Sequence, residues 1–356
     1  MYLMLKDTPV LNVSDDLKKI QEIIAPELLP VAMHNKCSIE KFNEWLSRRS
    51  MPCNRAGLKE VKEKFGERWL KGKNLASLTD QYWIRRRDEK WKKVSLFSHA
   101  YSYDIGNAFF CPWTLESIRS SDSPDLTTGG ILRKRWKQDG KSLKSNLIKE
   151  GCKAAGQEPL YEVLTAVICE NLGIKSADYE LCIEGYRLCS SSSNLADEDT
   201  ELVTAADIYY TEERKEDESI EEHLIRMCDS FGIPGVEQYV EDITLIDILT
   251  GNNDRNLSNM GFIRNTDTRE FIGPAPVYDS GSAYAMEKKR SSEDGMGNKR
   301  RQEIMKKASK KYNLEKILKD EGYIHMAETY PGFGEEEKTR FIGSVRIRNE
   351  ELLKMI

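Results

Sequence analysis

The sequence predicts an α+β fold in two lobes, a β-rich lobe followed by a helical lobe, behind an N-terminal α/β module. Three observations predict this class. The chain has 356 residues, about twice the usual size of a single domain. A hairpin signal lies within 130–149, and apolar residues recur at helical spacing in 236–250 and in the last fifty residues. We place the boundaries at 1–114, 115–210 and 211–356.

The N-terminal module is expected to contain two amphipathic helices. Asp15 to Ile24 and Ile39 to Arg48 carry apolar residues at helical spacing, and Ser38 is a suitable N-cap for the second. The segment 80–91 mixes tryptophan with basic residues. Such a mixture can bind nucleic acid, but we favour a packed surface helix.

The middle of the chain predicts strands around one helix. The Asp-Gly pair in 138–141 is typical of a hairpin turn, and Gly173 is a typical helix C-cap. The expected elements are the strands Gly130 to Lys137, Ser145 to Lys149, Asp178 to Ile183 and Glu201 to Ala205, and the helix Glu158 to Leu172.

Charge is distributed in blocks although the whole chain has a formal charge of only −5. Residues 54–93 hold thirteen Lys/Arg and six Asp/Glu. Residues 286–320 hold twelve Lys/Arg and six Asp/Glu. Residues 196–222 hold two basic and twelve acidic residues. Solvated surface is the simplest interpretation of each block. We expect the acidic block to be an exposed insertion. The alternative is that it attracts a basic substrate by long-range steering.

Composition excludes several classes of protein. The longest nearly continuous apolar stretch is Val163 to Cys169, far short of the roughly 20 residues that span a bilayer. The N-terminus lacks the pattern of a signal peptide, so a cytoplasmic location is expected, while export to another cell stays open. Eight scattered cysteines and four histidines predict reduced thiols and no zinc or disulfide framework.

The most informative segment surrounds three polar residues in the second half of the chain. Asp254 and Asn259 are five positions apart in a loop that follows an apolar helix. Asp279 ends an apolar run about twenty residues later, and Gly281 follows it. Phosphoryl transfer from ATP needs one carboxylate for the attacking hydroxyl, with a second carboxylate and an amide oxygen for Mg²⁺. We therefore expect Asp254 to be catalytic and Asn259 and Asp279 to be metal ligands.

Upstream residues supply groups that would bind the nucleotide. Lys149 ends a short apolar strand, from which its ammonium could reach the phosphates, and Glu162 on the next helix could hold it extended. Backbone N–H groups of a small-residue loop could cover the phosphates. That loop contains the candidates Thr127, Thr128, Gly129 and Gly130. The backbone at Thr204 and Ala205 could bond the adenine edge, and a buried edge strand explains the same residues equally well.

These residues, in this order, resemble the HipA-like kinases, which are related to the phosphatidylinositol 3/4-kinase-like and eukaryotic-like protein kinases. The resemblance covers roughly residues 120 to 350 and rests on the motifs around Lys149, Glu162, Asp254 and Asp279. It implies a two-lobed protein-kinase-like fold and ATP-dependent, Mg²⁺-dependent phosphorylation of Ser or Thr on a protein, often with autophosphorylation. The same resemblance assigns Lys149 to the phosphates, Glu162 as its partner, Asp254 to catalysis and Asn259 with Asp279 to magnesium.

One position departs from the family and one loop invites modification. The family often has histidine where this chain has Asn256, which cannot titrate near neutral pH. The hydroxyl residues Ser121, Ser123, Thr127 and Thr128 lie in or just before the expected phosphate loop. Phosphate on them would add negative charge beside ATP, which is a route to self-inhibition.

Two other functions fit the sequence less completely. The motifs specify the phosphoryl donor and not the acceptor, so a small-molecule or lipid-headgroup kinase on the same scaffold is one alternative. A nucleic-acid-binding protein that uses the basic segment 54–93, with a degenerate kinase core, is the other. The intact set of Lys149, Asp254, Asn259 and Asp279 argues against degeneracy.

Overall fold

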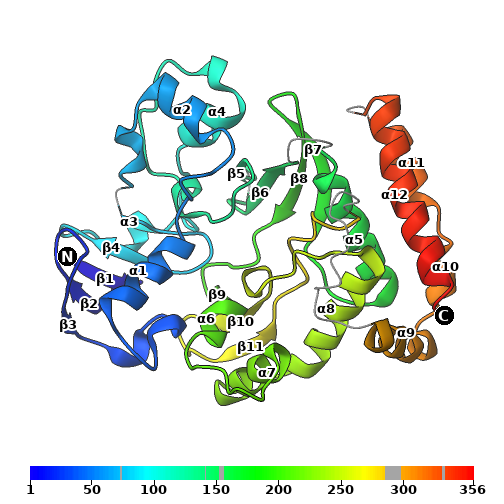
Figure 1. Cartoon of the computed structure of the whole chain (residues 1–356). Helices are drawn as coiled ribbons and strands as arrows, with labels where there is room; N and C mark the ends of the chain where they lie inside the picture. The colour runs from blue at the N-terminus through cyan, green and yellow to red at the C-terminus, as the bar shows by residue number, and fades with distance from the viewer. Residues whose placement is uncertain (73, 141, 152–155, 285–297, 331–332) are drawn as a thin grey trace. The chain divides into compact units, whose positions relative to one another are not determined.

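The computed structural model describes residues 1–72, 74–140, 142–151, 156–284, 298–330 and 333–356. The chain divides into two compact units, whose helices and strands are labelled in Figure 1. The first comprises Met1–Lys149, Ser192–Val236 and Met260–Ala275. The second comprises Glu150–Ser191, Glu237–Asn259 and Pro276–Ile356. The boundaries 1–114, 115–210 and 211–356, with their accessory module and two lobes, stay a prediction.

The first unit is built mainly from antiparallel strands. Its helices and strands are β1 (Tyr2–Leu5), β2 (Thr8–Val13), β3 (Ile20–Ile23), α1 (Ile39–Arg48), α2 (Leu58–Phe65), β4 (Tyr82–Arg85), α3 (Trp91–Val94), α4 (Asp104–Phe110), β5 (Lys134–Gln138), β6 (Ser145–Glu150), β9 (Thr200–Thr204), α6 (Ala205–Tyr209), α7 (Ile220–Ser230), β10 (Gly261–Asn265) and β11 (Phe271–Pro274). Strand order is β3-β2-β1-β4 in one sheet and β11-β10-β9 in another, while β5 pairs with β6.

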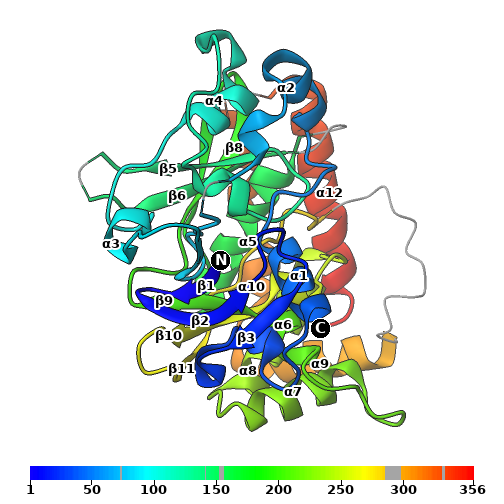
Figure 2. The ribbon, with the colours of Figure 1, turned by 90° about the vertical axis from the view of Figure 1, so that its left-hand side faces the viewer.

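One hydrophobic core of the first unit is formed by helix α1 and the N-terminal sheet, which Figure 2 shows side by side. Phe42 and Trp45 on α1 pack against Leu3, Leu11 and Tyr82 on three strands. Spacing of three along a helix puts the two aromatic rings on one face. The predicted helix 39–48 is confirmed, with the Ser38 side chain accepting a hydrogen bond from the Lys41 N–H.

The expected helix over 15–24 is wrong. Leu17 has φ +58°, and the Ser14 N–H donates to the Lys19 carbonyl, so a turn occupies the first half. Ser14 Oγ accepts from the Lys19 N–H, the type of local hydrogen bond with which serine competes against helix. The second half is strand β3, which pairs with β2. Isoleucines spaced for a helix here serve a short strand instead.

The tryptophan-rich segment 80–91 is packed as expected but is not a helix. Its first part is the strand β4, and Trp83 is fully buried with its indole N–H donating to the Lys6 carbonyl at 2.7 Å. The acidic block 196–222 is also more ordered than an exposed insertion, because it contains β9 and α6. In it Glu201 is buried and accepts from Arg264 and Arg269.

The second unit is mostly helical. It contains α5 (Glu158–Leu172), β7 (Tyr179–Glu184), β8 (Arg187–Ser193), α8 (Val236–Thr250), α9 (Asn298–Lys311), α10 (Leu314–Leu318), α11 (Gly322–Thr329) and α12 (Glu335–Leu353). The predicted helices 158–172 and 236–250 are confirmed with the same bounds. Gly173 has φ +66° and its N–H caps α5 by donating to the Glu170 carbonyl, as the sequence predicts. The expected mixture of helices and antiparallel strands is confirmed.

Candidate functional site

The candidate site in the second unit is organised around the buried side chain of Arg255. This guanidinium pairs with Asp247 on the last turns of α8, at 3.1 Å. It also donates to the backbone carbonyls of Asn259 at 2.9 Å and Tyr278 at 2.7 Å, and to the Ser280 hydroxyl at 2.9 Å. One fork of five donors therefore ties the end of a helix to two separate loops.

The first of these loops carries Asp254 and Asn259. Asp254 is exposed, so its carboxylate is open to a reactant, and its main-chain N–H donates to the Asn252 side chain at 3.3 Å. The Asn259 amide donates to the Asp254 carbonyl at 3.3 Å, an arrangement that folds the five-residue spacing into a turn. Asn256, which stands where the family often has histidine, shapes the same turn by accepting from the Ser258 N–H at 2.9 Å.

The second loop carries Asp279, which lies between two anchored neighbours. Tyr278 donates its hydroxyl to the Ser258 carbonyl at 3.0 Å and gives its own carbonyl to Arg255. The Asp279 N–H donates to the Tyr179 hydroxyl at 3.0 Å. Asp279 has φ +55°, a left-handed conformation that costs energy for a residue with a side chain and that concentrates at functional sites. Tyr278 and Arg255 together hold the Asp254 and Asp279 loops beside each other.

Helix α5 approaches the same loop through a glycine. A Cβ at Gly281 would lie 3.1 Å from the Glu158 side chain and 3.6 Å from the Glu162 side chain, so this glycine packs closely against α5. Glu162 is 2% exposed, and its carboxylate accepts a hydrogen bond from the Ser190 hydroxyl. The structure therefore places Glu162 on α5 next to the loop that follows Asp279.

Burial sets the electrostatics at the centre of this cluster. Removal from water raises the pKa of Asp247, and the adjacent Arg255 guanidinium opposes that rise. Burial by itself lowers the pKa of Arg255, but attraction and hydrogen bonding to Asp247, together with the nearby Tyr239 and Asp279, outweigh it, and the pKa is raised. Arg255 is therefore a permanent cation beneath the two loops.

The nucleotide-binding candidates Lys149, Thr127, Thr128, Gly129 and Gly130 lie in the first unit. Lys149 is on β6, where it is 5% exposed and opposite Lys134 in the ladder with β5. A pair between Lys149 and Glu162 joins residues of different units and stays a prediction.

The glycine loop is held by an arginine from the N-terminal module. Arg55 is buried and donates to the carbonyls of Thr128, Gly129 and Gly130, the last at 2.7 Å. Desolvation lowers the pKa of Arg55 to about 10, and nearby Asp125 opposes the change. With its carbonyls turned toward Arg55, this loop has a fixed backbone, whose role in covering phosphates stays a prediction.

The threonines of this loop have structural partners. Thr127 donates its hydroxyl to the Ala76 carbonyl at 2.7 Å, and Thr128 donates to the Pro124 carbonyl at 2.7 Å. Thr128 also accepts from the Trp136 indole N–H at 2.8 Å. Both are buried in and after the short 3₁₀ helix Pro124–Thr127. Any contact with phosphate would therefore come from the main chain of this loop.

Thr204 and Ala205 form the junction of β9 and α6. The Thr204 hydroxyl caps α6 by accepting from the Asp207 N–H at 3.2 Å. The Ala205 N–H donates to the Met260 carbonyl at 2.9 Å, and Ala205 is fully buried. This N–H already has a partner, so the adenine role stays a prediction that would have to use other backbone groups.

The basic segment 54–93 uses several of its cations internally. Beyond Arg55, Lys64 donates to the Pro112 carbonyl at 2.6 Å, and the Arg85 guanidinium lies 5.0 Å from the centre of the Tyr2 ring. Lys62 pairs with Glu67 at 3.2 Å. Such internal contacts do not favour a continuous nucleic-acid surface.

The residues present fit a magnesium ion shared with phosphates. Asn259 and Asp279 offer an amide oxygen and a carboxylate, which are hard ligands, on loops that Arg255 holds together. Within the described residues no group of three or more His, Cys, Asp or Glu side chains could hold a metal by itself. A two-ligand set is what Mg²⁺ uses when substrate phosphates and waters complete its shell.

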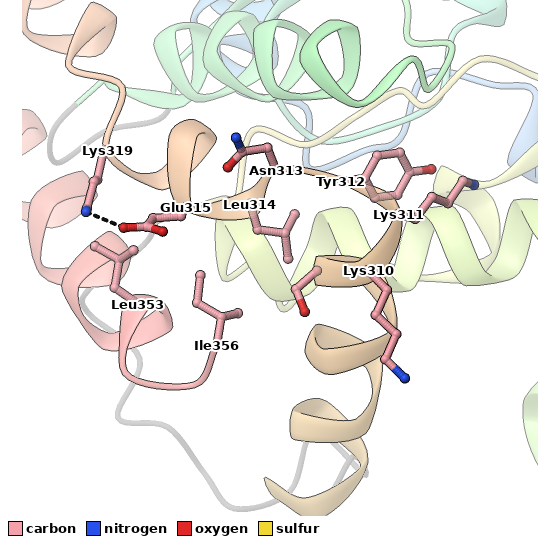
Figure 3. A pocket seen from close by; sticks show the side chains of 10 residues that line it. Lys310, Lys311, Tyr312, Asn313, Leu314, Glu315, Lys319, Leu353 and Ile356 are labelled. Atoms are coloured by element: carbon pink, nitrogen blue, oxygen red, sulfur yellow. Dashed lines mark hydrogen bonds and ion pairs between the residues drawn. The ribbon is translucent and has the colours of Figure 1, made fainter.

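A cavity elsewhere in the second unit holds none of the candidate residues. It has a volume of about 740 Å³ and lies where α9, α10 and the end of α12 meet (Figure 3). Leu314, Leu353 and Ile356 form its apolar lining, while Lys319 pairs with Glu315 at 2.5 Å on its rim. Part of the basic block 286–320 lies here, and its residues 286–297 fall outside the described residues.

Sequence reasoning missed the residues that support the site. Arg255 lies beside Asp254 in the motif, and Asp247 lies on the polar side of an otherwise apolar helix end. An ionisable residue among Ile246, Ile248 and Leu249 could have predicted a buried ion pair, because a buried carboxylate requires a partner. The Ser282 hydroxyl, 3.4 Å from the Asp254 carboxylate, left no signal in the sequence.

Comparison with known proteins gives a match only at the level of structure. No family model matches the chain, and no curated protein matches its sequence. A solved structure described as the Shewanella oneidensis MR-1 toxin–antitoxin system HipA, HipB and operator DNA complex aligns with 99% of this chain and 97% of its own. The TM-score is 0.59 at 14% identity.

A second solved structure is the Helicobacter pylori proinflammatory kinase CtkA, which aligns over 62% of this chain and 92% of its own. The TM-score is 0.49 at 16% identity.

In the described residues, no helix is both long and apolar enough to cross a bilayer. The resemblance to HipA-like kinases inferred from the sequence motifs is thus confirmed for the fold, which this chain shares with HipA along almost its whole length.

Proposed function

We propose that this protein is an ATP- and Mg²⁺-dependent serine/threonine protein kinase that also phosphorylates itself. The observation that carries the proposal is the joint support of Asp254, Asn259 and Asp279 by Arg255. One guanidinium holds the carbonyl of Asn259 and that of the residue preceding Asp279, so the two expected metal ligands come from loops fixed to each other.

Each residue has a role that follows from its surroundings. The exposed Asp254 carboxylate would accept the proton of the attacking Ser or Thr hydroxyl. Asn259 and Asp279 would hold Mg²⁺, which neutralises phosphate charge when bound. Lys149 would bind the phosphates as a charge-assisted donor. Phosphoryl transfer relies mainly on such positioning, and the largely buried Arg255 keeps the two loops in place.

The proposal is tested by transfer of labelled γ-phosphate from Mg-ATP, first with the protein alone and then with a generic basic protein. Asp254→Ala and Asp279→Ala should each lower transfer by about 100-fold or more. Asn253→Ala is the matched control, because Asn253 is exposed and adjacent to Asp254. Thermal unfolding of each variant checks that the fold is intact.

Three results discriminate the alternatives. Transfer that survives in both aspartate variants would overturn the assignment of the site. Label that appears only on an added lipid or small molecule would support a kinase with a different acceptor. A lack of stabilisation by Mg-ATP together with salt-sensitive DNA binding would favour the nucleic-acid alternative.

A further inference from the structure

A second, more enclosed cavity lies inside the helical part of the second unit. Its volume is about 240 Å³, and α5, α10, α11, α12 and the end of α8 supply its walls. Apolar side chains dominate those walls, among them Leu164, Ile168, Leu249, Leu318 and Val345. An engineered apolar cavity of about 150 Å³ takes up benzene. The cavity here is therefore large enough for an aromatic molecule.

Polar side chains also line the wall: Asn171 and Asp320, which are exposed, and Tyr284, Tyr323 and Asn349, which are buried. Tyr284 is 5% exposed and Asn349 is 9% exposed, and both line the cavity. In the described part of the chain, neither the Tyr284 hydroxyl nor the Asn349 side-chain amide bonds to another protein group, and neither is among the fully buried atoms that lack a partner, so both keep some accessible surface. They are placed to bond a polar group on a molecule in the cavity.

The mouth of the cavity is marked by an exposed apolar residue. Val167 lies one turn along α5 from Leu164 and is 41% exposed, whereas Leu164 and Ile168 are buried. Met326 on α11 lines the same cavity and is half-buried. A ligand that enters here would cover apolar surface that the protein itself leaves in water.

The cavity contacts the elements that carry the candidate catalytic residues. Helix α5 holds Glu162, and Leu249 lies just before the loop of Asp254. Tyr284 closes the segment that begins at Asp279, and its N–H donates to the Thr250 carbonyl at 2.8 Å. A molecule packed against all three elements would favour one relative arrangement of them.

We propose that this cavity binds a small, uncharged, mostly apolar molecule with one hydrogen-bonding group, of the indole or phenol class. Occupancy stabilises α5 and the two loops in one arrangement and so changes affinity for Mg-ATP. Binding to the cavity stands by itself, while the coupling to ATP rests on the proposed function.

Indole is the probe, and the full-length protein is titrated by calorimetry. Val167→Trp and Met326→Trp fill the cavity from two walls and should weaken indole binding at least tenfold. Glu170→Trp is the matched control, because Glu170 is exposed on α5 and does not line the cavity. It should bind within about twofold of the wild type.

Methyl NMR of the wild-type protein provides a test that needs no variant. Indole should shift the methyl signals of Leu164, Ile168 and Val345, and Ile84 in the first unit should not respond. Absence of saturable binding up to the solubility of indole would overturn the proposal. Shifts that avoid the cavity methyls, or equal binding by folded Val167→Trp and Met326→Trp, would overturn it as well.

The coupling is measured as indole affinity with and without saturating Mg-ATP. Linkage requires that each ligand change the affinity of the other by the same factor, and a change of at least threefold is expected. If ATP does not bind while indole does, the proposed function fails and the cavity site stands. If both bind with no mutual effect, the coupling is refuted.

Discussion

Substitution of Arg255 offers the sharpest test of how the candidate site is built. Its side chain is 8% exposed and that of Asp247 is 15% exposed, so the pair is largely removed from water. Arg255→Ala would leave the Asp247 carboxylate buried without its counter-charge. It would also release the carbonyls of Asn259 and Tyr278 and the Ser280 hydroxyl.

The magnitude follows from these contacts. Removal of one partner from a buried ion pair costs about 3–5 kcal/mol. Asp247 keeps a hydrogen bond from the Asn252 amide at 2.9 Å and a little solvent contact. We therefore expect Arg255→Ala to lower the free energy of unfolding by about 3 kcal/mol. Arg255→Lys keeps the charge but loses the fork, so it should cost about 1.5–3 kcal/mol, the value of one hydrogen bond to a charged group.

Unfolding by urea, followed by far-UV circular dichroism, measures the loss. All six tryptophans lie in the first unit, so their fluorescence follows that unit while circular dichroism at helical wavelengths also follows the second. Asp247→Ala and the double variant complete a mutant cycle, in which a coupling of about 1–3 kcal/mol is expected. Phosphate transfer by Arg255→Lys should fall about 10- to 100-fold, since the loops shift.

Two results would refute this reasoning about Arg255. One is a cost below about 1 kcal/mol for Arg255→Ala, which would mean that the pair is not effectively buried. The other is strict additivity of the two single variants in the cycle, because residues in one network should couple. Normal transfer by Arg255→Lys would show that the loops keep their places without the fork.

Three further predictions concern the first unit. Gly130→Ala should lower the free energy of unfolding by about 1–3 kcal/mol, because Gly130 has φ +85° and a Cβ would lie 2.4 Å from Lys134 Nζ. Gly140→Ala is the control and should be nearly neutral, because the space around Gly140 is open. Equal melting temperatures for the two variants would contradict this prediction. Hydrogen bonding from Arg226 lowers the pKa of Glu218 to about 2 from its usual 4.5. The stability that Glu218 contributes is therefore complete above about pH 4.5 and lost as pH falls toward 2, and Glu218→Gln should flatten the melting temperature over that range. Mass spectrometry after incubation with Mg-ATP should find phosphate on half-buried Ser121 before buried Thr127 or Thr128; absence of phosphate throughout 117–130 would end this hypothesis.

The fold could be predicted from sequence where local and tertiary preferences agree. Helices 158–172 and 236–250 have apolar residues in excess and, for the first, a glycine at the point where the left-handed cap is needed. The prediction failed at 15–24 because pairing with β2 decided the outcome, and that strand is a tertiary partner that no window of eleven residues contains.

The limits of the two compact units could not be predicted along the chain for a related reason. Strands β9 and β10 are about sixty residues apart in sequence and pair directly, with Gly261 opposite Thr204. Arg269 from the turn after β10 donates to the Tyr82 hydroxyl at 2.8 Å. Contacts of this kind join the N-terminal module to later segments, so composition shifts do not mark the limits of the compact units.

The candidate site shows which part of a functional motif the sequence reveals. Residues that meet a reactant must have a given chemistry at a given spacing, so Asp254, Asn259 and Asp279 could be identified as a set. Residues that support them need only complement one another in space. Arg255 looks like a surface cation in the sequence, yet it is buried because Asp247, seven residues before the catalytic candidate, offers it a partner. A buried cation of this kind costs energy unless every donor is used. Arg255 uses its donors on the backbone of both loops. The hydrogen bonds that offset the cost of its burial therefore also fix the position of one expected metal ligand relative to the other.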